Sequence, residues 1–147
     1  MIKTEEELMG LEYDWLACDA DGCVALFTTA GRGYAPVELR RDTDLYLRTI
    51  ELILTAPAST EAVTAPIIKE GLVNIWREMA CRGFFSFDGV AHMGTYDRES
   101  VPRHPARLSE LPPEIAEVVG RIRLVHVRFA EAQRVTPDRI KRAEELA

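Results

Sequence analysis

The first apolar positions of the chain form two short runs, residues 13–19 and 24–29, on either side of an Asp-Gly pair. Asp-Gly supplies the two positive-φ positions of a type I′ turn at little steric cost, so this segment predicts a β-hairpin. With Asp-Gly at the centre of the turn, Cys18 lies opposite Ala25. Both faces of the hairpin then carry apolar side chains, which places it inside a sheet or between two covering layers.

Two later segments have the apolar spacing of three to four residues that is typical of helices. The first begins at Asp42 or Thr43, either of which can cap it, and its apolar stripe is Tyr46, Leu47, Ile50, Ile53 and Leu54. The second extends from about Pro66 to Arg82 and is ended by Gly83. Its stripe is the stronger one and consists of Ile68, Leu72, Ile75, Trp76 and Met79. We expect both stripes to pack in the core.

The second half of the chain contains further hairpin and helix patterns. They are an aromatic strand at 84–88, a returning strand at 96–101, a helix opened by Pro112 and Pro113, a strand within 121–129 and a helical turn or two after Thr136. Because the strands come in hairpins rather than alternating singly with helices, an α+β fold is favoured over a doubly wound one. We predict a single α+β domain over residues 1–147, with an antiparallel sheet built from hairpins and two main helices packed on it.

The composition and the N-terminal residues indicate where in the cell the protein is expected. Apolar residues make up 47% of the chain and charged residues 29%, which is an ordinary globular balance. No apolar run approaches the roughly 20 residues of a membrane-spanning helix, and residues 1–7 are polar and acidic, unlike a signal peptide. We therefore expect a cytoplasmic protein without a membrane partner; whether it forms a homo-oligomer stays open.

The negative charge is concentrated in the first two-thirds of the chain. Residues 1–97 carry 8 Lys and Arg against 16 Asp and Glu, whereas residues 98–147 carry 10 against 8. Nucleic-acid affinity comes mostly from cations that meet phosphates, so no nucleic-acid partner is expected. An acidic surface suits a basic protein partner instead, because complementary fields speed encounter.

The cysteines and histidines do not form a recognisable site. The three cysteines are too few and odd in number for a disulfide framework, and no C-x-x-C pair or local Cys/His pair could start a zinc site. A thiol enzyme would need one of the three scattered histidines, His92, His104 and His126, to approach a cysteine through the fold. We expect no metal and no cofactor.

The sharpest enzymatic pattern is the apolar run that ends in Asp19-Ala20-Asp21-Gly22. It resembles the first motif of the haloacid-dehalogenase-like phosphohydrolases. The resemblance implies that Asp19 is a phosphoryl-accepting nucleophile and Asp21 a general acid/base, with Mg²⁺ between carboxylate and phosphate. The later motifs of that family lack convincing counterparts, and a strand directly after Gly22 suits a hairpin better. A small Mg²⁺-dependent phosphohydrolase therefore stays as the alternative hypothesis.

Scattered segments across about three-quarters of the chain resemble a loose group of small uncharacterised bacterial proteins. They are residues 13–15 through 27–33, Arg82 to Phe85, Tyr96 to Arg98, Val101-Pro102 and Leu111-Pro112. Some members of that group resemble immunity proteins, which neutralise toxins by binding them. The resemblance implies an antiparallel α+β fold and a binding role without catalysis, and it assigns no functional residues.

The leading hypothesis is therefore a bacterial, noncatalytic interaction domain, immunity-like, that binds a basic partner. Its expected surface is acidic and consists of Glu12, Asp14, Asp19 and Asp21, to which Asp42 and Asp44 could add. We expect Trp15 or Tyr34 to act as a central aromatic anchor, because buried aromatic side chains dominate binding energy at interfaces.

Overall fold

A computed structural model describes residues 2–8, 10–90 and 94–146 of the chain. Its helices are α1 (Glu5–Leu8), α2 (Val37–Arg41), α3 (Thr43–Thr55), α4 (Ile75–Ala80), α5 (Pro113–Val119) and α6 (Pro137–Leu146), with a 3₁₀ turn at Leu108–Glu110. Its strands are β1 (Asp14–Asp19), β2 (Val24–Thr28), β3 (Ala62–Thr64), β4 (Phe85–Gly89), β5 (Tyr96–Pro102), β6 (Arg123–Leu124) and β7 (Arg134–Val135). None of the helices in the described ranges is long and apolar enough to cross a bilayer.

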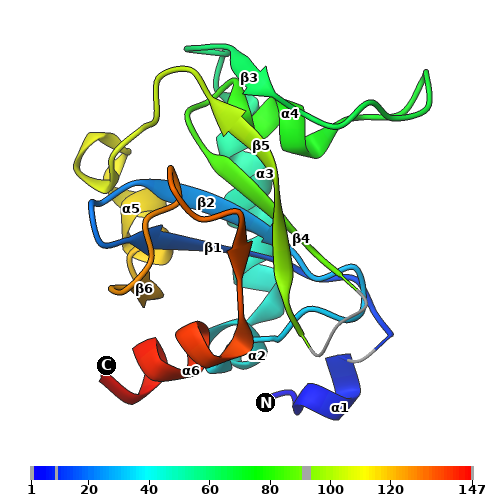
Figure 1. The fold of residues 1–147 in the computed structure, drawn as a ribbon, viewed down its shortest axis with the longest axis vertical. Helices are drawn as coiled ribbons and strands as arrows, with labels where there is room; N and C mark the ends of the chain where they lie inside the picture. The colour runs from blue at the N-terminus through cyan, green and yellow to red at the C-terminus, as the bar shows by residue number, and fades with distance from the viewer. Residues whose placement is uncertain (1, 9, 91–93, 147) are drawn as a thin grey trace.

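The strands form one seven-stranded sheet in the order β3-β5-β4-β2-β1-β6, with β7 paired to β5 (Figure 1). The predicted hairpins β1–β2 and β4–β5 are antiparallel, but β2 lies parallel to β4 and β1 lies parallel to β6. The α+β class is thus confirmed, whereas the expectation of a purely antiparallel sheet is wrong. The chain returns to the sheet after long connections through α2–α4 and α5, and these crossovers bring β4 and β6 back in the direction of their neighbours.

The β1–β2 hairpin forms where predicted, with its register shifted by one residue. Cys18 lies opposite Val24 rather than Ala25. Of the Asp-Gly pair, Gly22 has the positive φ (81°), and its N–H donates to the carbonyl oxygen of Asp19 at 3.2 Å. The loop is therefore a tight turn followed by a left-handed glycine, which is the common three-residue hairpin connection, and not a type I′ turn.

Aromatic side chains fill one face of the sheet. The rings of Trp15, Phe27 and Phe87 stack side by side with centroid distances of 4.1 and 5.0 Å, and Tyr96 and Phe129 pack against Phe27. All five are essentially inaccessible to solvent. Figure 1 shows α3 behind the sheet and the chain between β6 and β7 crossing in front of it, so the β1–β2 hairpin is covered on both faces, as its pattern predicted.

The two predicted helices have different outcomes. The first is confirmed as α3, which begins after Asp42, whose carboxylate accepts the N–H of Leu45 at 2.9 Å. The second was expected over 66–82 and is wrong for most of its length, because only Ile75–Ala80 is helical. Asn74 caps this short helix, and the preceding segment contains Gly71 at a φ of 89°, which ordinary helical residues do not adopt. With six helices in the described residues, the expectation of two main helices is too simple.

The last third of the chain also contains shorter strands than its sequence pattern predicted. The strand expected within 121–129 is only β6, and the rest of that segment turns back to place the Phe129 N–H on the carboxylate of Asp19. The helix opened by Pro112 and Pro113 forms as α5, and the expected terminal turn or two is the ten-residue α6.

Candidate functional site

The structure separates the predicted acidic surface into two groups at opposite ends of β1. Asp19 and Asp21 lie at the hairpin tip, where β1 ends. Asp14 opens the strand and Glu12 precedes it. Six strand residues span roughly 20 Å, so these carboxylates cannot act on one small ligand.

At the hairpin tip, the carboxylate of Asp19 is almost completely buried and is used by the fold. Its Oδ1 accepts the backbone N–H groups of Asp21 and Cys23, both at 2.9 Å, and its Oδ2 accepts the N–H of Phe129 at 2.8 Å. A carboxylate with three backbone donors links the hairpin to the chain that follows β6. These bonds hold the oxygen atoms that the phosphohydrolase hypothesis would need for attack and for Mg²⁺.

Asp21 is exposed at the same tip and makes only weak side-chain contacts. Its Oδ2 lies 3.7 Å from Nε of Arg128, and both side chains face solvent. Its backbone carbonyl oxygen accepts a 2.6 Å hydrogen bond from Arg107. Asp21 can therefore contact a partner, but it does not converge with Asp19 on a common point.

The two aromatic residues expected as anchors are committed to internal contacts. Trp15 has no exposed surface, and its indole N–H donates to the Tyr96 hydroxyl at 3.0 Å, so the expectation that it anchors a partner is wrong. Tyr34 is half-buried; its hydroxyl donates to Glu144 at 2.6 Å and Nζ of Lys141 lies 5.2 Å from its ring centre. Burial, followed by the bond to Glu144, raises the pKa of Tyr34. Both contacts come from α6, so Tyr34 packs against that helix.

At the other end of β1, the sheet register brings together carboxylates that are distant in sequence. Asp14 pairs with Thr28 on β2, and Thr28 pairs with Asp88 on β4. Cross-strand neighbours share a face of the sheet, and Glu12 and Glu99 both lie close enough to Asp88 to act on it electrostatically or be acted on by it. We call Glu12, Asp14, Asp88 and Glu99 the acidic cluster.

The protonation equilibria of the cluster reflect its crowding. Burial, followed by the charges of Glu12 and Asp88, raises the pKa of Asp14 to about 6. Burial also raises the pKa of Asp88, against the hydrogen bond from Thr28 and the charge of Arg32, which both lower it. The pKa of Glu99 is raised by burial and by Asp88 and Asp97. Three neighbouring carboxylates are therefore harder to ionise than ordinary surface carboxylates.

A chain of side-chain hydrogen bonds fixes the centre of the cluster. The indole N–H of Trp76 donates to Oγ1 of Thr28 at 3.1 Å, and the Thr28 hydroxyl donates to Oδ1 of Asp88 at 2.6 Å. The backbone oxygen of Trp76 accepts the hydroxyls of Ser86 and Ser100. Helix α4 is thus held against β4 and β5, and the half-buried Trp76 ring lies beside the acidic cluster.

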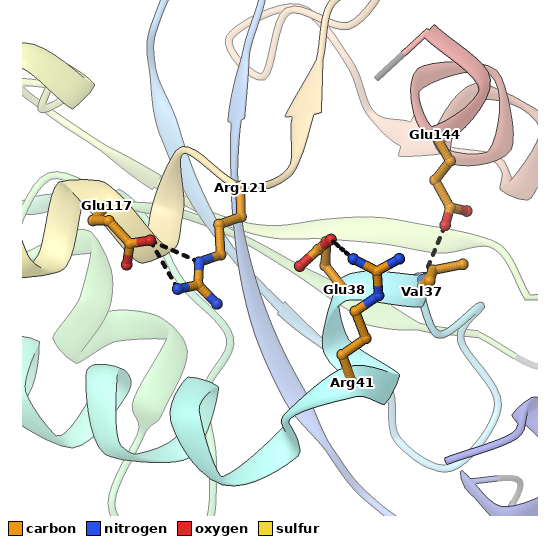
Figure 2. A network of polar contacts seen from close by, with 6 residues as sticks. All are labelled: Val37, Glu38, Arg41, Glu117, Arg121 and Glu144. Carbon is orange, nitrogen blue, oxygen red and sulfur yellow. Dashed lines mark hydrogen bonds and ion pairs between the residues drawn. The ribbon is translucent and has the colours of Figure 1, made fainter. Parts of the chain in front are cut away.

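Several acidic side chains elsewhere in the structure have partners. Figure 2 shows Glu38 with Arg41 (2.9 Å), Glu117 with Arg121 (2.8 Å) and Glu144 accepting the N–H of Val37 (2.9 Å). The ion pairs within the described ranges include no member of the acidic cluster. Within the described chain, Arg32 is near enough to lower the pKa of Asp88 but forms no ion pair with a member of the cluster.

The remaining candidates do not join this site. Asp42 caps α3 and Asp44 is exposed in its first turn. Cys18 and Cys23 are buried, and burial raises the pKa of both thiols, which makes them poor nucleophiles. His92 lies outside the described residues. Within residues 2–8, 10–90 and 94–146, no group of three or more His, Cys, Asp or Glu side chains is arranged to hold a metal ion.

Sequence reasoning found Glu12 and Asp14 but missed Asp88, Glu99 and Trp76. The available signal was weak, because Asp88 simply ends an aromatic strand and Glu99 sits inside the returning one. Only the parallel pairing of β2 with β4, which the sequence did not indicate, places Asp88 beside the start of β1.

Comparisons with known proteins give no match for this chain among protein-family models, curated proteins or solved structures.

Proposed function

We propose that this chain is a noncatalytic, immunity-like interaction domain of a bacterial cell, and that it binds a basic protein partner through the acidic cluster. The observation that carries the proposal is the cluster itself: neighbouring carboxylates with raised pKa values and no contacting cation among the described residues. Burial, together with the neighbouring like charges, makes these carboxylates costly to ionise in the folded state. A lysine or arginine from a partner would recover that energy by completing the ion pairs that the cluster lacks.

The neighbouring Trp76 supports the same proposal. Its ring is half-buried, lies against Thr28 and takes the anchoring role expected of Trp15. A partly exposed tryptophan next to crowded carboxylates suits a basic residue that is flanked by apolar ones, because aromatic rings attract cations and also bury apolar area. Long-range attraction between opposite charges would speed the encounter.

The phosphohydrolase alternative finds less support. Asp19 and Asp21 do not converge, and three backbone N–H groups occupy the Asp19 carboxylate. Magnesium-dependent turnover of a generic phosphate ester that disappears in Asp19→Asn would favour this alternative, provided that the variant is folded.

The test begins with capture of partners from the source cells on the tagged full chain, followed by direct binding of the purified partner. We expect a partner rich in lysine or arginine, whose affinity falls at least tenfold between about 50 and 500 mM salt, since exposed charge attraction is screened. The double variant Asp14→Asn/Asp88→Asn should weaken binding at least tenfold. The amide oxygen introduced by Asp88→Asn can still accept the Thr28 hydroxyl, so the hydrogen-bond chain is kept.

The matched control is Glu114→Gln/Glu145→Gln, which removes the same charge from two exposed helix positions. It should reduce affinity less than threefold. A partner whose binding ignores both salt and the Asp14/Asp88 variant would refute the proposed surface, and so would equal losses in the two double variants.

A further inference from the structure

A second surface, separate from the acidic cluster, exposes an unusual amount of apolar side chain. We call residues 62–74, which comprise β3 and the irregular segment before α4, the apolar loop. Figure 1 shows it projecting from the body of the molecule next to α4. Its aliphatic residues Val63, Ile67, Leu72 and Val73 have exposed fractions of 59%, 99%, 65% and 79%. Clustered apolar exposure of this kind marks interaction sites rather than ordinary surface.

The apolar loop is tied down at both ends, so these side chains are presented by an ordered segment. The Asn74 side chain donates to the carbonyl oxygen of Pro66 at 2.7 Å and accepts the N–H of Arg77. Near β3, the Arg103 N–H donates to the carbonyl oxygen of Glu61 at 2.8 Å. A partner that covers the loop would therefore lose little entropy in ordering it.

The loop also contains β3, one of the edge strands of the sheet. Strand β3 ends the strand order and pairs with β5 on one side; its other side has no strand partner among the described residues. Unprotected edges pair readily with strands of other chains, and proteins commonly blunt them with charge or cover them. Here the edge carries the exposed Val63 instead of a charged residue.

The charges around the loop indicate which partner fits. The chain as a whole has a net charge of −6, so two copies repel each other over most of their surface. Residues 61–82 are balanced, however, with Glu61, Glu70 and Glu78 against Lys69, Arg77 and Arg82. A basic partner would gain nothing from this neutral face. A second copy could approach here without charge repulsion, and the adjacent Lys69 and Glu70 could each meet the opposite charge across a two-fold axis.

We infer that the apolar loop is the self-association surface of this protein, occupied by the same loop of a second copy in a two-fold dimer. Edge-to-edge contact of the two β3 strands would continue the sheet across the axis. A hollow of about 610 Å³ lies between the loop and α4, lined by residues that include Pro66, Leu72 and Arg77. It offers space for an aliphatic side chain of the other copy.

The size of the apolar surface suits such a dimer. Burying one aliphatic side chain removes roughly 100 Å² of apolar surface from water. The exposed fractions of the four residues then add up to roughly 300 Å² of apolar area per copy. A two-fold contact uses the patch twice, giving about 600 Å², which is the apolar share of an interface of roughly 1,000 Å². That is the lower size for a specific interface, so we expect a dimer that dissociates on dilution.

The test is the mass of the full chain in solution, measured by sedimentation equilibrium from about 1 to 200 µM. We expect the mass to rise with concentration from 16.5 kDa toward twice that value. The double variant Ile67→Ser/Val73→Ser changes two highly exposed residues, so it should fold as the wild type does and stay monomeric across the range. Leu47→Ser, at a 53% exposed position on α3, is the matched control and should dimerise like the wild type.

A second measurement uses the unmodified chain. Lys69 and Arg142 are both exposed in the single chain, and only Lys69 would be covered in the dimer. When the protein is concentrated from about 1 to 200 µM, trypsin cleavage after Lys69 should therefore slow at least fivefold relative to cleavage after Arg142. A wild-type chain that stays monomeric at the highest concentration would overturn the inference and leave the loop to a different protein. A dimer that persists in the Ile67/Val73 variant would place the interface elsewhere and would equally refute it.

Discussion

Asp19 and Asp14 are the last and the first residues of strand β1, and their carboxylates lie in contrasting environments. The carboxylate of Asp19 is buried and accepts hydrogen bonds from three backbone N–H groups. Asp14 is partly buried beside Glu12 and Asp88, and those charges add to burial in raising its pKa. The same residue type thus stabilises the fold at one end of the strand and destabilises it at the other. We attribute a structural role to Asp19, whose carboxylate is fully hydrogen-bonded, and a binding role to Asp14, whose carboxylate is not.

The largest effect should follow from removing the satisfied carboxylate. Asp19→Ala leaves the N–H groups of Asp21, Cys23 and Phe129 without their acceptor, and the Phe129 group is buried away from water. We expect the free energy of unfolding to fall by about 3 kcal/mol. Urea unfolding followed by tryptophan fluorescence measures the change.

Asp19→Asn provides the companion variant. Its amide can keep one oxygen as an acceptor but turns an N–H₂ group toward a donor, so its cost should lie between zero and that of Asp19→Ala. A loss below about 1 kcal/mol for Asp19→Ala would show that the hairpin tip does not depend on this carboxylate, and the contrast with Asp14 would disappear.

The structural role of Asp19 explains part of what the sequence could and could not predict. The apolar runs located β1, β2, β4 and β5 because each strand is locally apolar and bounded by turn residues. The turn register failed by one residue, since the carboxylate of Asp19 and the chain around Phe129 select the three-residue loop. Phe129 is 110 residues away from Asp19, and no local pattern carries that information.

The apolar loop shows the opposite error. Ile68, Leu72 and Ile75 have helical spacing, yet the segment before Asn74 is irregular and Leu72 faces solvent. Periodicity predicts a helix only where a surface is available to bury its stripe, because short isolated helices are marginal in water. The sheet covers Met79 of α4 but does not reach the residues before Asn74. If a second copy covers the loop, the apolar residues at 68 and 72 correctly predicted a buried surface, although their spacing wrongly predicted a helix.

An intermediate effect should follow from neutralising Asp14. Between about pH 4 and 6 the unfolded chain ionises this side chain at its ordinary pKa, while the folded chain holds the proton up to about pH 6. Stability from this group is therefore full below about pH 4 and is lost as the pH rises through about 6. Asp14→Asn should raise the free energy of unfolding at about pH 8 by about 2 kcal/mol and leave it nearly unchanged at about pH 4.

Thermal unfolding measured across this pH range tests the sign. The control is Glu114→Gln, an exposed carboxylate at the start of α5, whose curve should follow that of the wild type. An Asp14→Asn variant that is less stable than the wild type at the alkaline end would contradict the crowding of the acidic cluster, and with it the energetic reason for binding a cation there.

The smallest effect should come from the exposed carboxylate that shares the tip with Asp19. Asp21→Asn removes only a 3.7 Å contact with Arg128, and both partners are solvated. Exposed ion pairs of this kind contribute about 0–1 kcal/mol, and the backbone groups of Asp21 that bond to Asp19 and Arg107 are unchanged. We expect unfolding to shift by less than about 0.5 kcal/mol and affinity for the basic partner to be unaltered. Urea unfolding and the binding assay used for the Asp14/Asp88 variant measure both. A substantial loss of affinity with unchanged stability would move the partner site to the hairpin tip, because it would give Asp21 the role that we propose for Asp14.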